Sequence, residues 1–92
     1  MPKYAARSDA NQQEIMDALR TIGCSVVSIH RVGQGVPDLL VGDPVTGCNF
    51  LLEVKAGKSG LTPDEFRFFA EWQGQRDIVR SVEDALRVIG RL

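Results

Sequence analysis

The sequence predicts a single small α/β domain in which a mixed β-sheet is flanked by helices. Two short apolar runs, within residues 38–42 and 49–55, lie on either side of a turn rich in Pro and Gly, which is the pattern of a β-hairpin. Segments with apolar residues at helical spacing precede and follow this hairpin. Because helical and strand patterns alternate along the chain, we expect the order helix, three strands, helix, strand, helix.

The length and composition set the limits of this fold. Ninety-two residues allow one domain with one core, which we place at residues 1–92. A hydrophobic content of 43% and a charged content of 25% are ordinary for a soluble globular domain. No signal peptide and no membrane-spanning run is evident. We therefore expect a cytoplasmic protein with no membrane association, in which Cys24 and Cys48 stay reduced.

The N-terminal part is expected to form a helix followed by a strand. Residues 1–7 carry no clear period and are expected to be a loose arm. Ser8 is a suitable N-cap for a helix that runs to about residue 22 and stops at a glycine. The β-branched run at 25–32 predicts a strand, and residues 33–35 provide a flexible entry to the hairpin.

The hairpin strands, at 38–42 and 49–55, are apolar on both faces, which is typical of central strands that are covered on both sides. A symmetric ladder about the turn places Asp38 opposite Glu53. Two directly opposed carboxylates repel each other, and a divalent cation such as Mg²⁺ between them would relieve the repulsion. Lys55 lies two residues beyond Glu53 and therefore on the same face.

A plainer interpretation of these charges is ion pairing on a solvated sheet face, with Arg31 and Lys55 as partners of Asp38 and Glu53. The apolar neighbours of both acids make simple exposure the weaker interpretation, so we favour a metal site. Lys55 could form only a salt bridge, or it could bind a phosphoryl oxygen or position an attacking water. The salt bridge and the catalytic role are compatible.

The C-terminal half is expected to be helix, strand and helix. Thr62, Pro63 and Glu65 form a capping-box pattern at the start of a helix that runs to about residue 73. A short strand at 77–80 follows, and Ser81 caps the last helix. On the first of these helices, Phe68 and Trp72 lie four residues apart. They pack in the core by default, but they would also suit a dimer interface.

Pro37-Asp38 followed by Glu53-Val54-Lys55 resembles the motif of the PD-(D/E)XK nuclease superfamily, whose fold is restriction-endonuclease-like. The fuller pattern resembles the small VRR-NUC (virus-type replication-repair nuclease) branch of that superfamily. It adds a helical Glu14 upstream, the glycine shortly before Pro37, and the Leu-Thr-Pro segment after Lys55. The resemblance spans roughly residues 8 to 87.

The resemblance implies a metal-dependent endonuclease that hydrolyses DNA phosphodiester bonds and leaves 3′-hydroxyl and 5′-phosphate ends. It implies that Asp38, Glu53 and Glu14 bind Mg²⁺ or Mn²⁺ with the Val54 carbonyl as a further ligand, and that Lys55 is catalytic. Proteins that resemble this chain act as homodimers on branched DNA such as four-way (Holliday) junctions.

Other residues are weaker candidates for the site. Glu65 stands where the resembling family commonly has Gln, and capping-box chemistry explains it without a function, although an accessory role stays open. The candidate DNA contacts are His30, Arg31, Gln34, Lys58 and Arg67. A lone His is usually structural.

The charge of the chain bears on its partner. A net charge of −1 argues against a large basic groove. Bound divalent cations would bring the net charge to about +1 to +3, which is compatible with phosphate binding. Gly57-Lys58-Ser59 resembles the end of a P-loop, but Leu52 stands where that motif needs Gly, so we expect no nucleotide cofactor. Two alternatives stay open: a non-catalytic nucleic-acid-binding or assembly module, and a generic or restriction-type nuclease.

Overall fold

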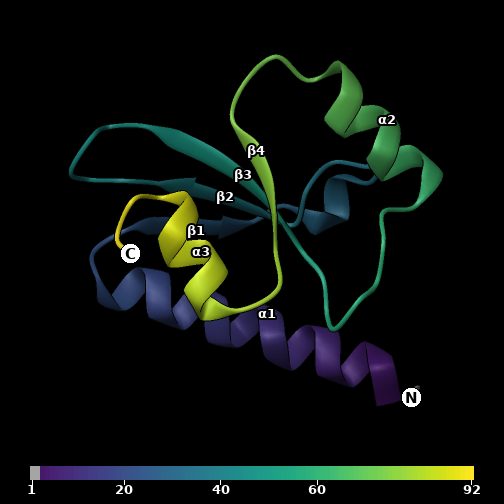
Figure 1. Ribbon diagram of the computed structural model, residues 1–92, viewed down its shortest axis with the longest axis horizontal. Helices are drawn as coiled ribbons and strands as arrows, with labels where there is room; N and C mark the ends of the chain where they lie inside the picture. The colour runs from purple at the N-terminus through teal and green to yellow at the C-terminus, as the bar shows by residue number, and fades with distance from the viewer. Residues whose placement is uncertain (1–2) are drawn as a thin grey trace.

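The computed structural model describes the backbone of residues 3–92 and the side chains from Asp9 onward. Within this range a four-stranded sheet of order β1-β2-β3-β4 is combined with three α-helices and one 3₁₀-helix (Figure 1). β1, β2 and β3 are antiparallel to their neighbours, and β4 is parallel to β3. The elements are α1 (Lys3–Thr21), β1 (Ser25–Ser28), η1 (His30–Val32), β2 (Leu39–Gly42), β3 (Asn49–Val54), α2 (Pro63–Glu71), β4 (Arg76–Val79) and α3 (Val82–Val88). The predicted α/β class and element order are confirmed.

Helix α1 is longer than the sequence pattern predicted. It begins at Lys3, so residues 3–7 continue the helix instead of forming a loose arm, and Ser8 lies inside the helix instead of capping it. Met1 and Pro2, the rest of the expected arm, lie outside the described residues. Since residues 3–21 contain no Gly or Pro, nothing in that segment interrupts a helix. No helix in the described part of the chain is long and apolar enough to cross a membrane.

The first strand is shorter than predicted. β1 ends at Ser28, where the chain turns into η1 instead of continuing as a strand to Val32. The ladder with β2 stops at the Ser28–Leu39 pair, and one further hydrogen bond joins the Ile29 N–H to the Asp38 carbonyl at 2.8 Å. β-branched residues alone do not keep a strand extended where its pairing partner has ended.

The predicted hairpin register is confirmed. Leu39 pairs with Leu52 and Leu40 pairs with Leu51. The regular ladder begins at Leu39, so Asp38 lies one step before it and the Asp38 side chain, instead of its backbone, accepts a hydrogen bond from the Val54 N–H at 2.8 Å. The register therefore sets the carboxyl of Asp38 beside the end of β3.

The hairpin turn is held by Asp43, a buried residue that the sequence analysis did not single out. Its carboxylate accepts hydrogen bonds from the Val45 N–H at 3.0 Å and the Thr46 hydroxyl at 2.9 Å, and it forms an ion pair with Arg91. The Arg91 hydrogen bond holds the pKa of Asp43 below its usual value, although burial opposes this shift. The turn is thereby tied to the C-terminal end of the chain.

Helices α1 and α3 pack on one face of the sheet and form the core with it (Figure 1). The largest fully buried side chains of this core come from α1 and from three strands. They are Ile15, Leu19, Leu39, Leu52, Val41 and Val79, together with Pro37 at the entry to β2. Since the two hairpin strands bury alternate residues against these helices, β2 and β3 present their remaining side chains to the other face.

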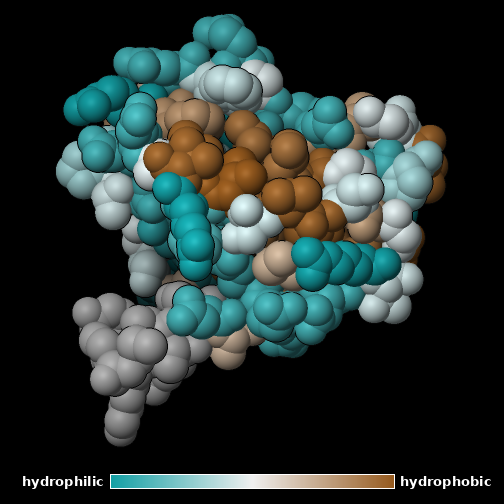
Figure 2. Space-filling model, turned by 180° about the vertical axis from the view of Figure 1, so that it is seen from behind, coloured by the Kyte–Doolittle hydropathy of each residue, from teal (hydrophilic) through white to brown (hydrophobic). Residues whose placement is uncertain are grey.

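The other face of the sheet is open over the row that Val27, Leu40 and Leu51 form, so the predicted two-sided cover is wrong there. Val27, Leu40 and Leu51 form a row across three paired strands, and Val27 and Leu40 are 54% and 39% exposed. α2 has no buried residue and does not cover this row. Figure 2 shows a continuous apolar area on the molecule seen from behind. We call Val27, Leu40, Leu51 and the exposed Trp72 the open face.

The predicted caps of the last two helices are confirmed. In the capping box of α2, the Thr62 hydroxyl accepts a hydrogen bond from the Glu65 N–H and the Glu65 carboxylate accepts one from the Thr62 N–H. The Ser81 hydroxyl accepts a hydrogen bond from the Asp84 N–H at the start of α3. The boundaries shift slightly, because α2 ends at Glu71 with Trp72 as its C-cap and β4 spans Arg76–Val79.

The start of α2 is held against the loop that enters β2. Gly35 has a φ of +78°, and a Cβ atom there would lie 2.2 Å from the Asp64 carbonyl oxygen. Only glycine permits both this backbone conformation and this close approach. The loop and the helix start are therefore in direct contact.

We predict that Gly35→Ala destabilises the protein more than Gly47→Ala does. Both glycines have similar positive φ angles, but a Cβ at Gly47 meets no atom within 4 Å. Gly47→Ala should lose about 1 kcal/mol from backbone strain, whereas Gly35→Ala adds a steric clash with α2. Urea denaturation measures both losses, and equal losses would contradict the close contact between the loop and α2.

Candidate active site

A hollow of about 310 Å³ lies where α1, η1, the ends of β2 and β3 and the start of α2 meet. It brings together four residues that the sequence analysis singled out for chemistry: Asp38, Glu53, Lys55 and Glu65. His30 and Val54 also line it. Asp38, Glu53, Lys55 and Glu65 come from three separate segments of the chain, which the fold brings together.

Glu53 is the most unusual residue of this hollow. It is 2% exposed, and its Oε1 atom has no hydrogen-bond partner. Burial, followed by a hydrogen bond to Asp38 and the charges of Asp38 and Glu65, raises the pKa of Glu53 to about 9. Without a cation, Glu53 therefore holds a proton at neutral pH. A buried polar atom without a partner is costly and calls for an explanation.

Asp38 is oriented by the backbone of β3, through the hydrogen bond from the Val54 N–H described above. A hydrogen bond between the Asp38 and Glu53 carboxyls is one of the interactions that raise the pKa of Glu53. The two acids that the register predicted to be opposed are therefore adjacent. Their closeness is one reason that the charged form of Glu53 is disfavoured.

Lys55 extends into the same hollow and contacts two acids. Its Nζ atom lies 2.7 Å from Glu65 Oε1 and 3.7 Å from Glu53 Oε2, and its side chain is 14% exposed. Burial would raise the pKa of Glu65, but the hydrogen bonds from Lys55 and the Thr62 backbone lower it overall. Glu65 therefore carries a negative charge beside the lysine at neutral pH.

Helix α1 contributes Asp9 and Gln12 to the hollow, but not Glu14. The Asn11 side chain fixes the helix there by donating hydrogen bonds to the carbonyl oxygens of Lys55 at 3.1 Å and Arg80 at 3.2 Å. Glu14 is exposed and does not line the hollow. At about 100° per residue, the five residues from Asp9 to Glu14 turn the side-chain direction by about 140°.

Asp9 and Gln12 were missed by the sequence analysis. Their spacing of three residues places them on one face of a helix, which is a usable signal. This spacing indicates a site only if the helix begins upstream of Ser8. With Ser8 as the N-cap, Asp9 lies in the first helical turn, where its favourable interaction with the helix dipole already explains an acid. Ser59, in the loop after β3, also lines the hollow and was not singled out.

The candidate DNA contacts are distributed around this hollow. Among them only His30 lines it, and the Ser28 hydroxyl lies 2.9 Å from His30 Nδ1. Arg31, Gln34, Lys58 and Arg67 are exposed and lie outside the lining. Arg80 shapes the rim instead, because its guanidinium donates hydrogen bonds to the carbonyl oxygens of Gly57 and Ser59.

The donor set fits a hard divalent cation in part. No group of three or more His, Cys, Asp or Glu side chains in the described part of the chain is arranged to hold a metal ion. However, Mg²⁺ is usually bound by one or two carboxylates and keeps several waters. The adjacent carboxyls of Asp38 and Glu53, with the unpartnered Glu53 Oε1, supply oxygen ligands of the kind that Mg²⁺ prefers.

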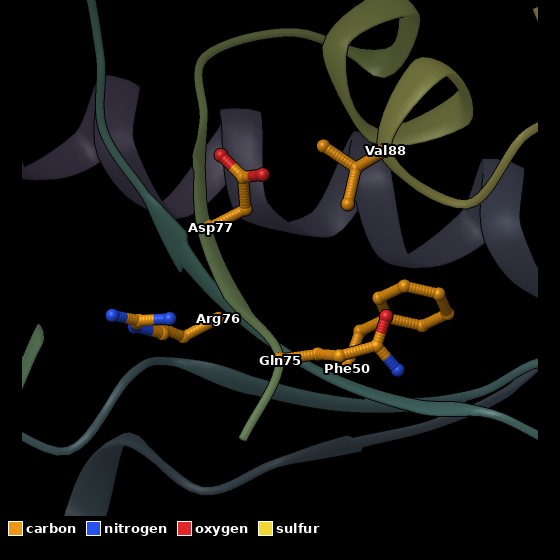
Figure 3. Close-up of a pocket in the computed structure, with 5 residues that line it drawn as sticks. All are labelled: Phe50, Gln75, Arg76, Asp77 and Val88. Carbon is orange, nitrogen blue, oxygen red and sulfur yellow. The ribbon is translucent and has the colours of Figure 1, made fainter. Parts of the chain in front are cut away.

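A second hollow, of about 190 Å³, lies away from these acids and is lined by Phe50, Gln75, Arg76, Asp77 and Val88 (Figure 3). In the close-up Arg76 points away from Asp77 and Val88. Its guanidinium donates two hydrogen bonds to the Phe69 carbonyl oxygen, at 3.1 and 3.0 Å. Asp77 is the one acid in this lining, so the hollow lacks the paired carboxylates of the first.

Comparison with solved structures finds a chain described as "VRR_NUC domain", with a TM-score of 0.75. The match covers 89% of this chain and 92% of the other, at 22% sequence identity. No family model matches the sequence, and no curated protein matches it. The fold is therefore that of a VRR-NUC domain, as the sequence resemblance indicated.

We predict that the stability of the metal-free protein depends on pH through Glu53. Its pKa is about 9 in the folded state and near its ordinary value, 4.5, in the unfolded chain. Between these two pKa values the folded state binds more protons than the unfolded state. The stability that Glu53 contributes is therefore fully present below pH 4.5 and is lost as the pH rises toward 9. The quantity to measure is the free energy of unfolding of wild type minus that of Glu53→Gln, by urea denaturation.

That difference should fall between pH 5 and pH 9 in EDTA, and it should flatten in Mg²⁺ or Mn²⁺, because a cation favours the charged carboxylate. Subtracting the variant removes the opposite contributions of Asp43 and Glu65, whose pKa values are lowered. A difference that rises with pH in EDTA would contradict the buried, protonated state of Glu53.

Proposed function

We propose that the protein is a metal-dependent nuclease that hydrolyses DNA phosphodiester bonds. The observation that carries this proposal is the pair of adjacent carboxyls, Asp38 and Glu53, with Lys55 extending into the same hollow. The VRR-NUC fold adds support, since it is the fold of a nuclease family. The same residues in that order form the PD-(D/E)XK pattern in the sequence.

The residues of the hollow divide the chemistry between them. Mg²⁺ or Mn²⁺, when bound, supplies Lewis-acid stabilisation of the phosphate and lowers the pKa of a water. Asp38 and Glu53 bind the cation, and the Val54 carbonyl is a further candidate ligand. Lys55 donates a hydrogen bond to a phosphoryl oxygen or to the attacking water, and its positive charge offsets the negative charge that develops in the transition state.

The acid from α1 is Asp9 in this proposal. Asp9 lines the hollow, whereas Glu14, which the sequence resemblance suggested for this role, is exposed and lies outside the lining. Because Asp9 is not grouped with Asp38 and Glu53 as a direct set of ligands, it would contribute through a water of the hydrated cation. Such outer ligands are compatible with the hydrated coordination that Mg²⁺ usually keeps.

A non-catalytic nucleic-acid-binding module on the same fold is the main rival. The buried Glu53 argues against it, because an unpartnered buried oxygen lowers stability and a module without catalysis has no need to retain it. A restriction-type nuclease is the second rival. It reads bases directly, and a domain of this size leaves little surface for base contacts beyond those to the backbone.

We predict that Asp38→Asn and Lys55→Ala lose activity for different reasons. Asp38→Asn should lose both Mn²⁺ binding and DNA cleavage, because it removes a ligand. Lys55→Ala should keep Mn²⁺ binding and lose about a hundredfold or more in single-turnover rate, because a lysine is a donor and not a metal ligand. Calorimetric titration and a single-turnover cleavage assay measure the two effects.

Glu83→Gln, at an exposed acid of α3 outside the hollow, serves as the control and should change neither quantity. Unchanged Mn²⁺ affinity in Asp38→Asn would exclude Asp38 as a ligand. A near-normal cleavage rate in Lys55→Ala would exclude its catalytic role.

We further propose that the protein is a homodimer that selects branched DNA. The open face is apolar, and a hollow of about 310 Å³ on it is lined by Leu40, Leu51 and Trp72 among others. Trp72 stacks on Phe68 with ring centroids 5.1 Å apart. Glu53 and Lys55 lie on the same face of β3 as Leu51. A two-fold dimer through this face would therefore place the two candidate active sites next to the same interface.

We predict that Leu40→Lys dissociates this dimer and Val45→Lys does not. Both substitutions put the same charge on an exposed apolar position, but Val45 lies in the hairpin turn outside the open face. Light scattering should report about twice the chain mass of 10.1 kDa for wild type and Val45→Lys, and one chain mass for Leu40→Lys. A monomeric wild type would refute the dimer.

The substrate is tested with single-stranded, duplex, flap and four-way DNA of matched sequence in Mg²⁺. Because a dimer doubles the phosphate contacts and carries two sites, four-way DNA should be cut faster than linear duplex. Equal rates on linear and branched DNA would reduce the proposal to a generic nuclease. Absence of cleavage on all four, with Mn²⁺ binding retained, would favour the non-catalytic module.

A further inference from the structure

The position of Lys55 is set more by α2 than by the paired carboxyls. Its Nζ atom lies 2.7 Å from Glu65 Oε1, which is hydrogen-bonding distance, but 3.7 Å from Glu53 Oε2. Charge-assisted hydrogen bonds of the shorter kind are about twice as strong as neutral ones. The stronger restraint on the lysine therefore comes from a residue ten positions further along the chain.

Glu65 is itself held in place at the first turn of α2. The same Oε1 atom that accepts from Lys55 also accepts from the Thr62 N–H at 2.9 Å. The Glu65 backbone N–H in turn donates to the Thr62 hydroxyl at 3.3 Å. With its backbone and its carboxylate both fixed, Glu65 provides a rigid anchor for the lysine, and its side chain is only 18% exposed.

We propose that Glu65 is a positioning residue, which holds the Lys55 ammonium beside the Asp38–Glu53 pair from the N-terminus of α2. This inference rests on the proposed nuclease function. It assigns Glu65 a task beyond the helix cap that the sequence pattern explained. A cation bound by Asp38 and Glu53 would repel Lys55, and the negative charge of Glu65, 2.7 Å from the ammonium, would offset that repulsion.

The test compares Glu65→Ala, Glu65→Gln and a control, Asp64→Ala. Asp64 lies in the same first turn, is exposed and pairs with Arg67 at 3.6 Å, so its loss weakens the helix start without touching Lys55. The readouts are the single-turnover cleavage rate at saturating DNA, the Kd for DNA, and the rate at which Lys55 is modified by reductive methylation, followed by mass spectrometry.

Glu65→Ala should lower the single-turnover rate by about tenfold to a hundredfold, with a much smaller change in the Kd for DNA, because a misplaced group costs rate more than binding. Glu65→Gln should recover part of the rate, since its amide oxygen can accept from both donors. Asp64→Ala should cut at the wild-type rate. A wild-type rate in Glu65→Ala, or an equal loss in Asp64→Ala, would overturn the proposal.

Reductive methylation tests the contact between Lys55 and Glu65 independently of nuclease activity. In wild type Lys55 should be modified slowly relative to the exposed Lys58, and in Glu65→Ala the two rates should converge. If wild-type protein cuts no DNA, the nuclease function fails, but this protection pattern still supports the anchor. If Lys55 is as reactive as Lys58 in wild type, the anchor is wrong whatever the cleavage assay reports.

Discussion

β3 is the strand on which both the core and the candidate site depend. It lies between β2 and β4, so both of its edges are paired. Phe50, Leu52 and Val54 are buried in the core with α1 and α3. The alternate residues point the other way, and two of them, Glu53 and Lys55, are the chemical groups of the hollow. The packing that stabilises the strand therefore also fixes the direction of both groups.

The buried carboxyl of Glu53 sets the chemistry of the hollow. A residue that is 2% exposed and has an unpartnered oxygen lowers the stability of the fold unless something else occupies that oxygen. The surrounding contacts do not remove this penalty, since Asp38 disfavours the charged form and Lys55 is 3.7 Å away. Violations of local rules of this kind concentrate at functional sites.

The neighbours of Glu53 are held in place by contacts from different elements of the fold. Asp38 is held by the backbone of β3, and Lys55 is held by the start of α2. α1 is tied to the same region through Asn11, which contacts the carbonyl oxygens of Lys55 and Arg80. Helices α1 and α2 therefore both reach the end of β3 through polar contacts.

Much of this arrangement could be predicted from the sequence because it depends on short-range rules. The hairpin register follows from the turn and the alternation of β2 and β3, and the capping box at Thr62 and Glu65 is a local pattern. The extension of α1 to Lys3 could not be predicted, because residues 3–7 carry no apolar period. The predicted N-cap at Ser8 also hid the shared helical face of Asp9 and Gln12, whereas Glu14 was suggested by the family resemblance.

Contacts between distant segments could not be predicted from the sequence for a different reason. The Asp43–Arg91 ion pair joins residues 48 positions apart, and neither residue has a neighbouring pattern that specifies the other. The open face was likewise misjudged, because apolar residues on both faces of a strand do not tell whether a helix or another molecule covers them. Tertiary placement of α2 decides that question.

The alternation along β3 also explains how the chain can diverge. The apolar residues of the strand can be exchanged for others of similar size, whereas the proposed role of Glu53 depends on its carboxyl group. An inserted or deleted residue between Leu51 and Glu53 would turn the acid toward the helices and an apolar side chain toward the hollow. At its apolar positions such a strand therefore constrains the number of residues more than their identity. A backbone likeness with a TM-score of 0.75 at 22% identity is compatible with this constraint.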